Sequence, residues 1–276
     1  SVRGTLTAED TGYTNVVAVG DEVLVLESGA DEGVIEIVLP RRSVLARPDV
    51  FHSHLQQIIV ANVDQLLIVA SWEEPAIWFE LIDRYLISAE LHKLSPVICV
   101  NKIDLAENVD ICRAELKPYV SLGYSVLYTS ALTGEGIAEL REVLRERKTV
   151  LAGMSGVGKT SLLSAVQPGL ELRIGEISEW WHEGRHTTSQ VTMLPLEVGG
   201  FVVDTPGIRE FGLRGLYRDE LTRFYPEFTE AGEHCRFADC VHIHEPGCAV
   251  KRAVRQGRIS AVRYDNYCKI YHTLPA

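Results

Sequence analysis

A glycine-rich segment at residues 153–160 carries the most specific chemistry in this sequence. It reads Gly-Met-Ser-Gly-Val-Gly-Lys-Thr and fits the pattern G-x-x-x-x-G-K-[ST]. An apolar stretch precedes it and a helix-compatible stretch follows it, which is the context that a phosphate-binding loop requires. The glycines let backbone N–H groups surround a phosphate, and the positive end of the helix dipole adds to the attraction. We therefore predict a nucleoside triphosphate site here.

The pattern assigns roles to individual residues. Lys159 should reach the β- and γ-phosphates, and the Thr160 hydroxyl should bind Mg²⁺. A D-x-x-G segment at residues 204–207 follows an apolar run. It places Asp204 on the metal side and the Gly207 N–H toward the γ-phosphate, although D-x-x-G alone is common by chance. The residues predicted to contact the phosphates or to follow them into the helix are Gly153, Ser155, Gly156, Val157, Gly158, Lys159, Thr160, Ser161 and Gly207.

A polar segment at residues 184–189 reads Gly-Arg-His-Thr-Thr-Ser and suits a mobile switch, with an ordinary polar loop as the alternative. Thr187 or Thr188 could add a hydroxyl to Mg²⁺. Many GTPases place a Gln directly after D-x-x-G to orient the attacking water. Ile208 stands there instead and has no hydrogen-bonding group. We predict that His186 is the catalytic residue, because a neutral imidazole can accept a proton from water.

An N-K-x-D motif made of Asn101, Lys102 and Asp104 follows an apolar run and favours guanine. The Asp104 carboxylate can accept hydrogen bonds from the N1–H and N2–H₂ groups of guanine, whereas adenine has no donor at N1. Ser130 and Ala131 end the next apolar run, where a backbone N–H should reach the guanine O6. The predicted ligand is therefore GTP or GDP.

Three cysteines and a histidine in one short segment predict a metal site. All four coordination positions of a tetrahedral Zn²⁺ ion would be filled by Cys235, Cys240, His242 and Cys248. No position would remain for water, so one structural zinc ion is expected. His234 and His244 are the alternative imidazole ligands. The zinc ion should hold a small C-terminal domain together.

The elements that must position these groups alternate between apolar runs and helical stretches. Residues 58–63, 66–70, 96–100, 125–128 and 150–152 are predicted strands, and residues 76–91, 108–121 and 136–145 are predicted helices. Such alternation is typical of a parallel sheet with helices on both faces, which binds ligands at the carboxyl ends of its strands. Residues 1–50 suggest a small antiparallel sheet or barrel. We predict an α/β fold with domains at residues 1–50, 51–212 and 213–276.

The order of the motifs is inverted relative to ordinary GTPases. Base recognition at residues 101 and 130 precedes the phosphate loop at residue 153, and the switches follow it. The GTPase domain is therefore predicted to be circularly permuted. Its second switch leads directly into the C-terminal segment, so nucleotide state could be transmitted to that segment.

With these motifs in this order, the chain resembles the bacterial ribosome small subunit-dependent GTPases, also called circularly permuted GTPases. The resemblance covers nearly the whole chain, and the zinc ligands match the family spacing. It implies a partial OB-fold β-barrel at residues 1–50, the permuted P-loop GTPase domain and a mostly helical zinc-binding domain. It also implies that the small ribosomal subunit stimulates GTP hydrolysis in late subunit maturation, with the histidine before the switch threonines as catalyst. A GTP-responsive rRNA-binding module and a GTPase of another assembly are the alternatives.

The charge is divided along the chain. The total is −11, but residues 249–276 hold six positive groups and one negative group, net +5, which leaves −16 for residues 1–248. Such a basic segment suits ribosomal RNA. Tyr264, Tyr267 and Tyr271 could stack on bases or instead face the core. No apolar run approaches the ~20 residues of a membrane span, and cysteine usage suggests a reducing cytoplasm, so a cytoplasmic monomer without membrane partners is expected.

Overall fold

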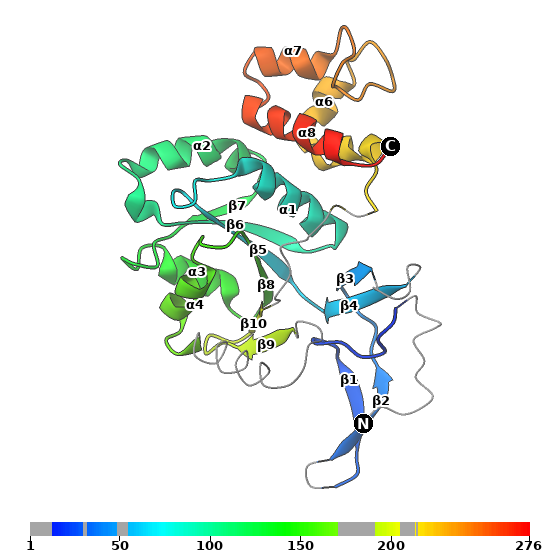
Figure 1. Cartoon of the computed structure of the whole chain (residues 1–276), viewed down its shortest axis with the longest axis vertical. Helices are drawn as coiled ribbons and strands as arrows, with labels where there is room; N and C mark the ends of the chain where they lie inside the picture. Colours follow the sequence, from blue (N-terminus) through cyan, green and yellow to red (C-terminus); the bar gives the residue numbers. More distant parts are fainter. Residues whose placement is uncertain (1–12, 30–31, 49–54, 171–190, 205–212, 214) are drawn as a thin grey trace.

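The computed structural model describes residues 13–29, 32–48, 55–170, 191–204, 213 and 215–276. A six-stranded sheet occupies the middle of the molecule, the N-terminal strands lie beyond one end of it, and the C-terminal helices lie beside helix α1 (Figure 1). No helix in the described part of the chain is long and apolar enough to cross a membrane.

The central sheet has the strand order β7-β6-β5-β8-β10-β9. Five of its strands are parallel: β5 (Gln65–Ser71), β6 (Ser95–Asn101), β7 (Ser125–Tyr128), β8 (Lys148–Ala152) and β10 (Phe201–Asp204). The edge strand β9 (Thr192–Pro195) runs antiparallel to β10 and was not predicted. Every residue of β5 is buried, because helices cover both faces of the parallel sheet, and its residues 66–70 are all apolar. The α/β prediction is confirmed.

Helices cover the two faces of this sheet (Figure 1). Helices α1 (Phe79–Leu91) and α2 (Val109–Ser121) pack against one face, and α3 (Ile137–Leu144) and α4 (Lys159–Val166) pack against the other. Leu66 and Ile68 of β5 belong to the first core, whereas Leu67 and Val69 belong to the second. This alternation follows from the two-residue period of a strand. Helix α1 begins at Phe79, three residues later than predicted.

The N-terminal strands form two antiparallel pairs within the described residues. Strand β1 (Val23–Glu27) pairs with β2 (Gly33–Val38), and β3 (Val44–Pro48) pairs with β4 (Gln56–Ala61). We expected the α/β alternation to begin with a strand at residues 58–63. That expectation is wrong, because the strand in this region, β4, pairs with β3, which precedes residue 50, and does not belong to the central sheet. The predicted domain boundaries and the OB-fold stay predictions.

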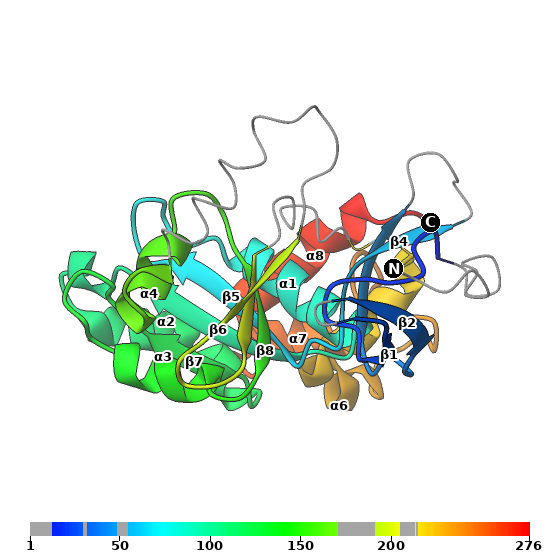
Figure 2. The same ribbon diagram turned by 90° about the horizontal axis from the view of Figure 1, so that it is seen from below.

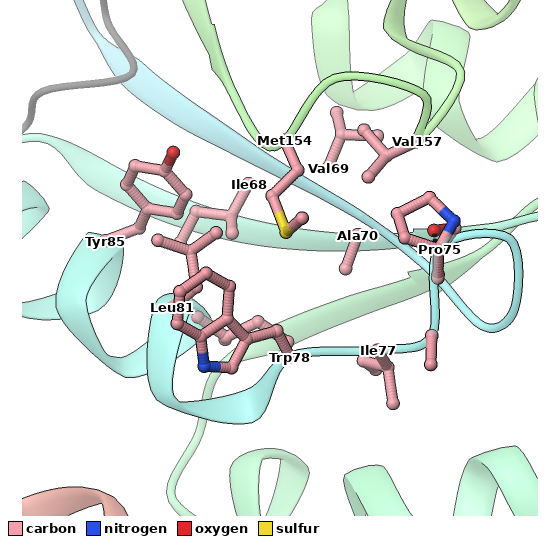
Figure 3. Close-up of a pocket in the computed structure, with 13 residues that line it drawn as sticks. Ile68, Val69, Ala70, Pro75, Ile77, Trp78, Leu81, Tyr85, Met154 and Val157 are labelled. Atoms are coloured by element: carbon pink, nitrogen blue, oxygen red, sulfur yellow. Dashed lines mark hydrogen bonds between the residues drawn. The ribbon is translucent and has the colours of Figure 1, made fainter. Parts of the chain in front are cut away.

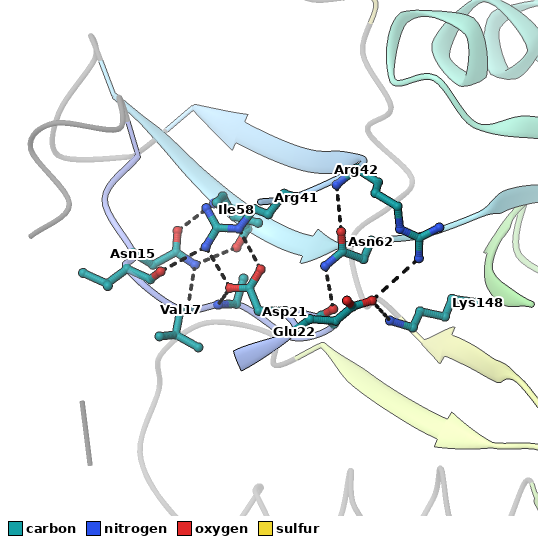
Figure 4. Close-up of polar contacts among 12 residues, drawn as sticks. Asn15, Val17, Asp21, Glu22, Arg41, Arg42, Ile58, Asn62 and Lys148 are labelled. Atoms are coloured by element: carbon teal, nitrogen blue, oxygen red, sulfur yellow. Dashed lines mark hydrogen bonds and ion pairs between the residues drawn. The ribbon is translucent and has the colours of Figure 1, made fainter. Parts of the chain in front are cut away.

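Polar contacts tie this N-terminal part to the central sheet (Figure 4). The Asn62 side chain accepts a hydrogen bond from the Arg42 N–H and donates one to the Gly20 carbonyl oxygen. The Asp64 carboxylate accepts the backbone N–H of Lys148 at 2.8 Å and pairs with Arg42 at 3.3 Å. These contacts lie at the amino ends of β5 and β8, which is the edge opposite the predicted nucleotide site.

The C-terminal segment folds around its own core of buried aliphatic and aromatic side chains. Its elements are η4 (Arg218–Phe224), η5 (Pro226–Phe228), α6 (Thr229–Gly232), α7 (Ala249–Arg255) and α8 (Ala261–Thr273). Ser260 caps the start of helix α8, and its hydroxyl accepts the Arg263 N–H. Such a side-chain cap satisfies one of the free donors of a helix start. The mostly helical character that the family resemblance implies for this segment is confirmed.

Candidate nucleotide and metal sites

The phosphate loop connects β8 to α4 at the carboxyl edge of the parallel sheet (Figures 1 and 2). Gly153, Gly156 and Gly158 have φ angles of 148°, 84° and 91°, where side chains are strained. A Cβ atom on Gly153 would lie 2.2 Å from the Val69 carbonyl oxygen. A Cβ atom on Gly158 would lie 2.3 Å from Nδ2 of Asn101. The loop conformation therefore requires glycine at both positions.

Lys159 begins α4, and its side chain turns back over the loop. Its Nζ donates to the carbonyl oxygens of Gly153 and Met154, both at 2.8 Å. Thr160 and Ser161 follow in the first helical turn and are exposed. The backbone N–H groups of that turn and the Lys159 ammonium group together form a cradle suited to a phosphate anion.

The N-K-x-D motif lies beside this loop. Asn101 ends β6, Lys102 adopts a left-handed conformation at φ 61°, and Asp104 lies in the short helix η2 (Ile103–Leu105). The Lys102 ammonium group contacts the Glu74 carbonyl oxygen. Asp104 accepts a hydrogen bond from the Ser130 hydroxyl, so the acceptor predicted for guanine is held by the predicted Ser-Ala motif.

Asn101 joins the three nucleotide motifs. Its Nδ2 donates to the Val157 carbonyl oxygen of the phosphate loop at 2.9 Å. Its Oδ1 accepts the backbone N–H of Ala131 at 3.2 Å. Asn101 is 1% exposed, so both contacts are shielded from water. Segments that lie more than fifty positions apart in the sequence, as Asn101 and Val157 do, therefore form one site.

Several predicted residues lie outside the described part of the chain: His186, Thr187, Thr188 and Gly207. Asp204 is the last residue of β10, which runs parallel to β8 and thus points to the same edge as the phosphate loop.

An apolar pocket lies between β5, the start of α1 and the phosphate loop (Figure 3). Trp78, Leu81 and Tyr85 line it from α1 and its cap, and Met154 lines it from the loop. Burial raises the pKa of the Tyr85 hydroxyl. The sequence analysis did not identify this pocket, because Tyr85 looks like any other apolar-face residue of α1.

The predicted metal ligands lie together in the C-terminal segment, and the group could hold a metal ion. The ligand atoms of Cys235, Cys240, His242 and Cys248 all lie within 4.8 Å of one another. Tetrahedral zinc with Zn–S near 2.3 Å and Zn–N near 2.05 Å would give S···S of about 3.8 Å and S···N of about 3.6 Å. The Cys235–Cys248 sulfur distance is 3.9 Å, and Nδ1 of His242 lies 3.6 Å and 3.5 Å from those sulfurs.

The surroundings of two metal ligands favour the forms that bind metals. The Cys235 sulfur accepts the N–H of Ala249 at 3.3 Å, at the start of α7. Burial opposes ionisation of Cys235, but backbone amides and the thiols of Cys240 and Cys248 together outweigh it, and the pKa of Cys235 is lowered. Burial and the neighbouring sulfurs instead raise the pKa of Cys240 to about 12. Burial also lowers the pKa of His242, which favours the neutral imidazole. His234 and His244 are exposed and do not belong to the group.

The structure reduces the predicted basic surface. Arg263 is 1% exposed and pairs with Asp83 and Glu227, so it cannot contact RNA. The Lys269 side chain pairs with Asp265. Exposed arginines remain on α7 and in the loops on either side of it: Arg236, Arg252, Arg255 and Arg258.

The alternative that the C-terminal tyrosines face the core is the correct one. Tyr267 is fully buried, and its hydroxyl donates to the Val241 carbonyl oxygen at 2.8 Å. The half-buried Tyr264 donates to the His242 carbonyl oxygen at 2.7 Å. Half-buried Tyr271 packs against the same core. These rings therefore support the metal loop and the C-terminal core.

Comparison with known proteins agrees with this arrangement of motifs. The family model described as RsgA GTPase matches residues 38–214. The small ribosomal subunit biogenesis GTPase RsgA 1 of Vibrio vulnificus is 44% identical over 92% of this chain and 73% of its own length. The corresponding protein of Thermotoga neapolitana is 40% identical over 94% of this chain and 84% of its own length.

Two solved structures share the fold. YjeQ from Thermotoga maritima aligns with a TM-score of 0.79 and 36% identity over 99% of this chain and 88% of its own. YloQ, described as a circularly permuted GTPase, aligns with a TM-score of 0.73 and 30% identity over 99% of this chain and 85% of its own. A phosphate loop that follows the base motif in the sequence but adjoins it in space is what such a permutation produces. The chain belongs to the RsgA GTPase family, a family of GTP-hydrolysing enzymes with a circularly permuted α/β GTPase domain.

Proposed function

We propose that this chain binds GTP at the carboxyl edge of its parallel sheet and hydrolyses it to GDP and phosphate. The contact of Asn101 with both Val157 and Ala131 carries the proposal, because it holds the base and phosphate motifs in one site. Asp104 would accept the guanine N1–H and N2–H₂ groups, and Lys159 would contact the β- and γ-phosphates. The backbone of the phosphate loop would contact the phosphates, and a backbone N–H at residues 130–131 would donate to the guanine O6.

Magnesium would be held with GTP by hydroxyl and carboxylate oxygens, which are the ligands this ion prefers. Thr160, at the start of the helix that follows β8 and the phosphate loop, and Asp204, at the end of the adjacent strand β10, would supply them. Thr187 or Thr188 would add a further hydroxyl. We propose His186 as the group that orients and deprotonates the attacking water, because Ile208 has no group that could do so.

We further propose that the metal ion in the C-terminal segment is Zn²⁺ and that its role is structural. Three sulfurs and one imidazole suit this ion, and the ligand distances agree with a tetrahedron around it. Bound zinc would fix the loop before α7. We keep the three-domain organisation as a proposal, with a partial OB-fold at residues 1–50, the GTPase domain at residues 51–212 and the zinc domain at residues 213–276.

The partner that fits this organisation is the small ribosomal subunit. The relatives from Vibrio vulnificus and Thermotoga neapolitana are named small ribosomal subunit biogenesis GTPases. The exposed Arg252, Arg255 and Arg258 could bind rRNA phosphates, while the acidic remainder limits non-specific binding. We propose that the chain acts as a cytoplasmic monomer in late maturation of this subunit and that the subunit stimulates GTP hydrolysis.

Turnover measured with and without purified small subunits tests this function. We expect low basal turnover, a marked rise with small subunits, and no rise with large subunits. A GTP-responsive rRNA-binding module would bind the subunit in a GTP-dependent way without any rise in turnover. The variant His186→Ala should lose the stimulated rate and keep GTP affinity, and retention of the full rate would exclude His186 as the catalyst.

The variant Asp104→Asn tests the base assignment separately. The amide should weaken GTP binding and favour xanthosine triphosphate, whose carbonyl oxygen on C2 can accept from the new N–H₂ group. Nucleotide affinities from equilibrium titration provide the measurement. Unchanged GTP affinity would contradict the assignment of Asp104 to the base.

A further inference from the structure

A short turn of residues 72–77, here called the connecting turn, joins β5 to α1 beside the predicted base site. Ser71 ends β5 and lies in register with Asn101, which ends β6. The N–H of Trp72 donates to the Asn101 carbonyl oxygen at 2.9 Å. The connecting turn therefore starts directly beside the N-K-x-D motif.

Two hydrogen bonds close the connecting turn. The Ser71 hydroxyl donates to the Pro75 carbonyl oxygen at 2.6 Å, and the Ile77 N–H donates to the Trp72 carbonyl oxygen at 3.2 Å. Ser71 is 1% exposed, so its hydroxyl depends on a partner within the protein. The side chain of Ser71 thus fixes the path of the backbone up to Pro75.

The connecting turn lies against both nucleotide motifs. The Lys102 ammonium group of the N-K-x-D motif donates to the carbonyl oxygen of Glu74. Pro75 lines the same pocket as Val157 of the phosphate loop (Figure 3). A Cβ atom on Gly156 of that loop would lie 3.6 Å from Cδ of Pro75, which is ordinary van der Waals contact. Six residues that follow β5 therefore border the site on two sides.

Backbone conformation marks the contact between Glu74 and Lys102 as one that its surroundings hold in place. Glu74 has a φ angle of 53° and Lys102 has a φ angle of 61°. Residues other than glycine are uncommon in this left-handed region, and they persist where neighbouring contacts determine the conformation. Such residues cluster at functional sites. Here both partners of one contact adopt it, next to the predicted base site.

We infer that Ser71 is a positioning residue for the base site: its buried hydroxyl fixes the connecting turn, and the Glu74 carbonyl oxygen of that turn holds the Lys102 ammonium group before GTP binds. The inference rests on the proposed GTP site. Ordering a long side chain such as lysine during binding costs affinity, and holding it in place beforehand removes part of that cost. Ser71 would thereby strengthen binding on the base side without touching the nucleotide.

Ser71→Ala in the full chain is the first test. Loss of the hydroxyl should weaken GTP and GDP binding by the same factor, about 2- to 10-fold, which corresponds to ordering one long side chain. Inorganic tripolyphosphate has no base, so it should compete with a labelled GTP analogue equally well in the variant and in wild type. Ser71→Thr restores the hydroxyl and should restore the affinity, since position 71 lines the pocket and the added methyl group has space.

Ser43 provides a matched control at the opposite edge of the sheet. Its hydroxyl also donates to a backbone carbonyl oxygen at 2.6 Å, that of Val63, and it is 8% exposed. Ser43→Ala should lower the thermal midpoint about as much as Ser71→Ala does, because each variant loses one comparable hydrogen bond. GTP affinity should stay unchanged in Ser43→Ala. The comparison separates positioning of the site from a general loss of stability.

A double-mutant cycle with Lys102 gives a readout that a merely structural role would not change. Lys102→Met keeps the apolar part of the side chain and removes the ammonium group that contacts Glu74. In the Lys102→Met background, Ser71→Ala should cause no further loss of GTP affinity, because the group that it positions is already absent. The Ser71→Ala loss in thermal midpoint should remain in that background.

Unchanged GTP affinity in Ser71→Ala would overturn the inference, and so would an equal loss of tripolyphosphate affinity or full additivity with Lys102→Met. If Ser71→Ala does not fold, Ser71→Cys decides by the same measurements, because it keeps a side chain of similar size and only a weak donor. Failure of wild type itself to bind GTP would instead refute the proposed function, so the two failures are distinguishable.

Discussion

Replacing Gly158 by alanine should damage the nucleotide site through its contact with Asn101. Gly158 has a φ angle of 91°, and the added Cβ would lie 2.3 Å from Nδ2 of Asn101. The strained backbone costs roughly 1–2 kcal/mol. Displacing the Asn101 amide breaks its buried hydrogen bond to the Val157 carbonyl oxygen, which costs a further ~1–3 kcal/mol. The total of ~2–5 kcal/mol corresponds to a loss of GTP affinity of about 30-fold at its lower end.

The sequence offers a matched control for this variant. Gly123 has a nearly equal φ angle of 89°, but nothing lies within 4 Å of the Cβ position. Gly123→Ala should therefore lower the free energy of unfolding by about 1–2 kcal/mol and leave GTP affinity unchanged. Fluorescence titration with a labelled GTP analogue and urea unfolding give the two quantities for both variants.

An Asn101→Ala background separates the two causes. Without the amide, the Cβ of Ala at position 158 has no atom to displace, so Gly158→Ala should cost only the backbone strain, about 5- to 30-fold in affinity. An equal loss of affinity for Gly158→Ala in both backgrounds would show that the contact with Asn101 is not responsible. If Gly158→Ala bound GTP as tightly as Gly123→Ala does, the assignment of residues 153–160 as the phosphate loop would be refuted.

Three further outcomes are expected. Removal of the metal with a strong chelator should release one equivalent of zinc per chain, measured by atomic absorption, and should lower the helical circular dichroism contributed by α7 and α8; a signal unchanged after release would contradict a structural role. Burial raises the pKa of Cys99 from its ordinary 9.0 to about 12, so its contribution to stability is complete below pH 9 and lost as the pH rises toward 12. Between pH 9 and 12, the free energy of unfolding of Cys99→Ala, measured with urea, should therefore fall less steeply with pH than that of wild type, by up to about 1.4 kcal/mol per pH unit. Equal slopes for the variant and wild type would refute this cause. Arg255→Glu should weaken small-subunit binding and reduce its salt dependence without changing basal GTP turnover, whereas Glu139→Lys on the exposed side of α3 is a control expected to leave both unchanged.

Local patterns in the sequence were sufficient to predict the α/β architecture and the three motifs at the edge of its sheet. The glycines of the phosphate loop, the asparagine that ends β6 and the metal ligands are each recognisable by type and spacing. Helix starts are less certain from sequence, since α1 begins only at Phe79 after a loop that contains Pro75. The antiparallel strand β9 escaped prediction because it is four residues long and contains Pro195.

Contacts between distant segments could not be predicted in the same way. Nothing near Asp83 or Arg263 in the sequence reveals their pairing, since 180 positions separate them. A weak signal existed, because an aspartate among Leu81, Ile82 and Leu86 must be buried or break the apolar face of α1. Strand β4 was assigned to the wrong sheet because a short apolar run fits an antiparallel pair as well as a parallel one.

The attachment of the N-terminal strands has a consequence for how such proteins can diversify. Asp64 and Lys148 hold those strands at the amino ends of β5 and β8, and the seven residues of β5 span about 23 Å between that edge and the phosphate loop. Substitutions in the N-terminal strands can therefore accumulate, and the surface they present can be remodelled, with little effect on nucleotide chemistry. The C-terminal segment has no such freedom, because its buried arginine must match an aspartate on α1. The two ends of the chain should consequently evolve at different rates, with the N-terminal end adapting to new docking surfaces.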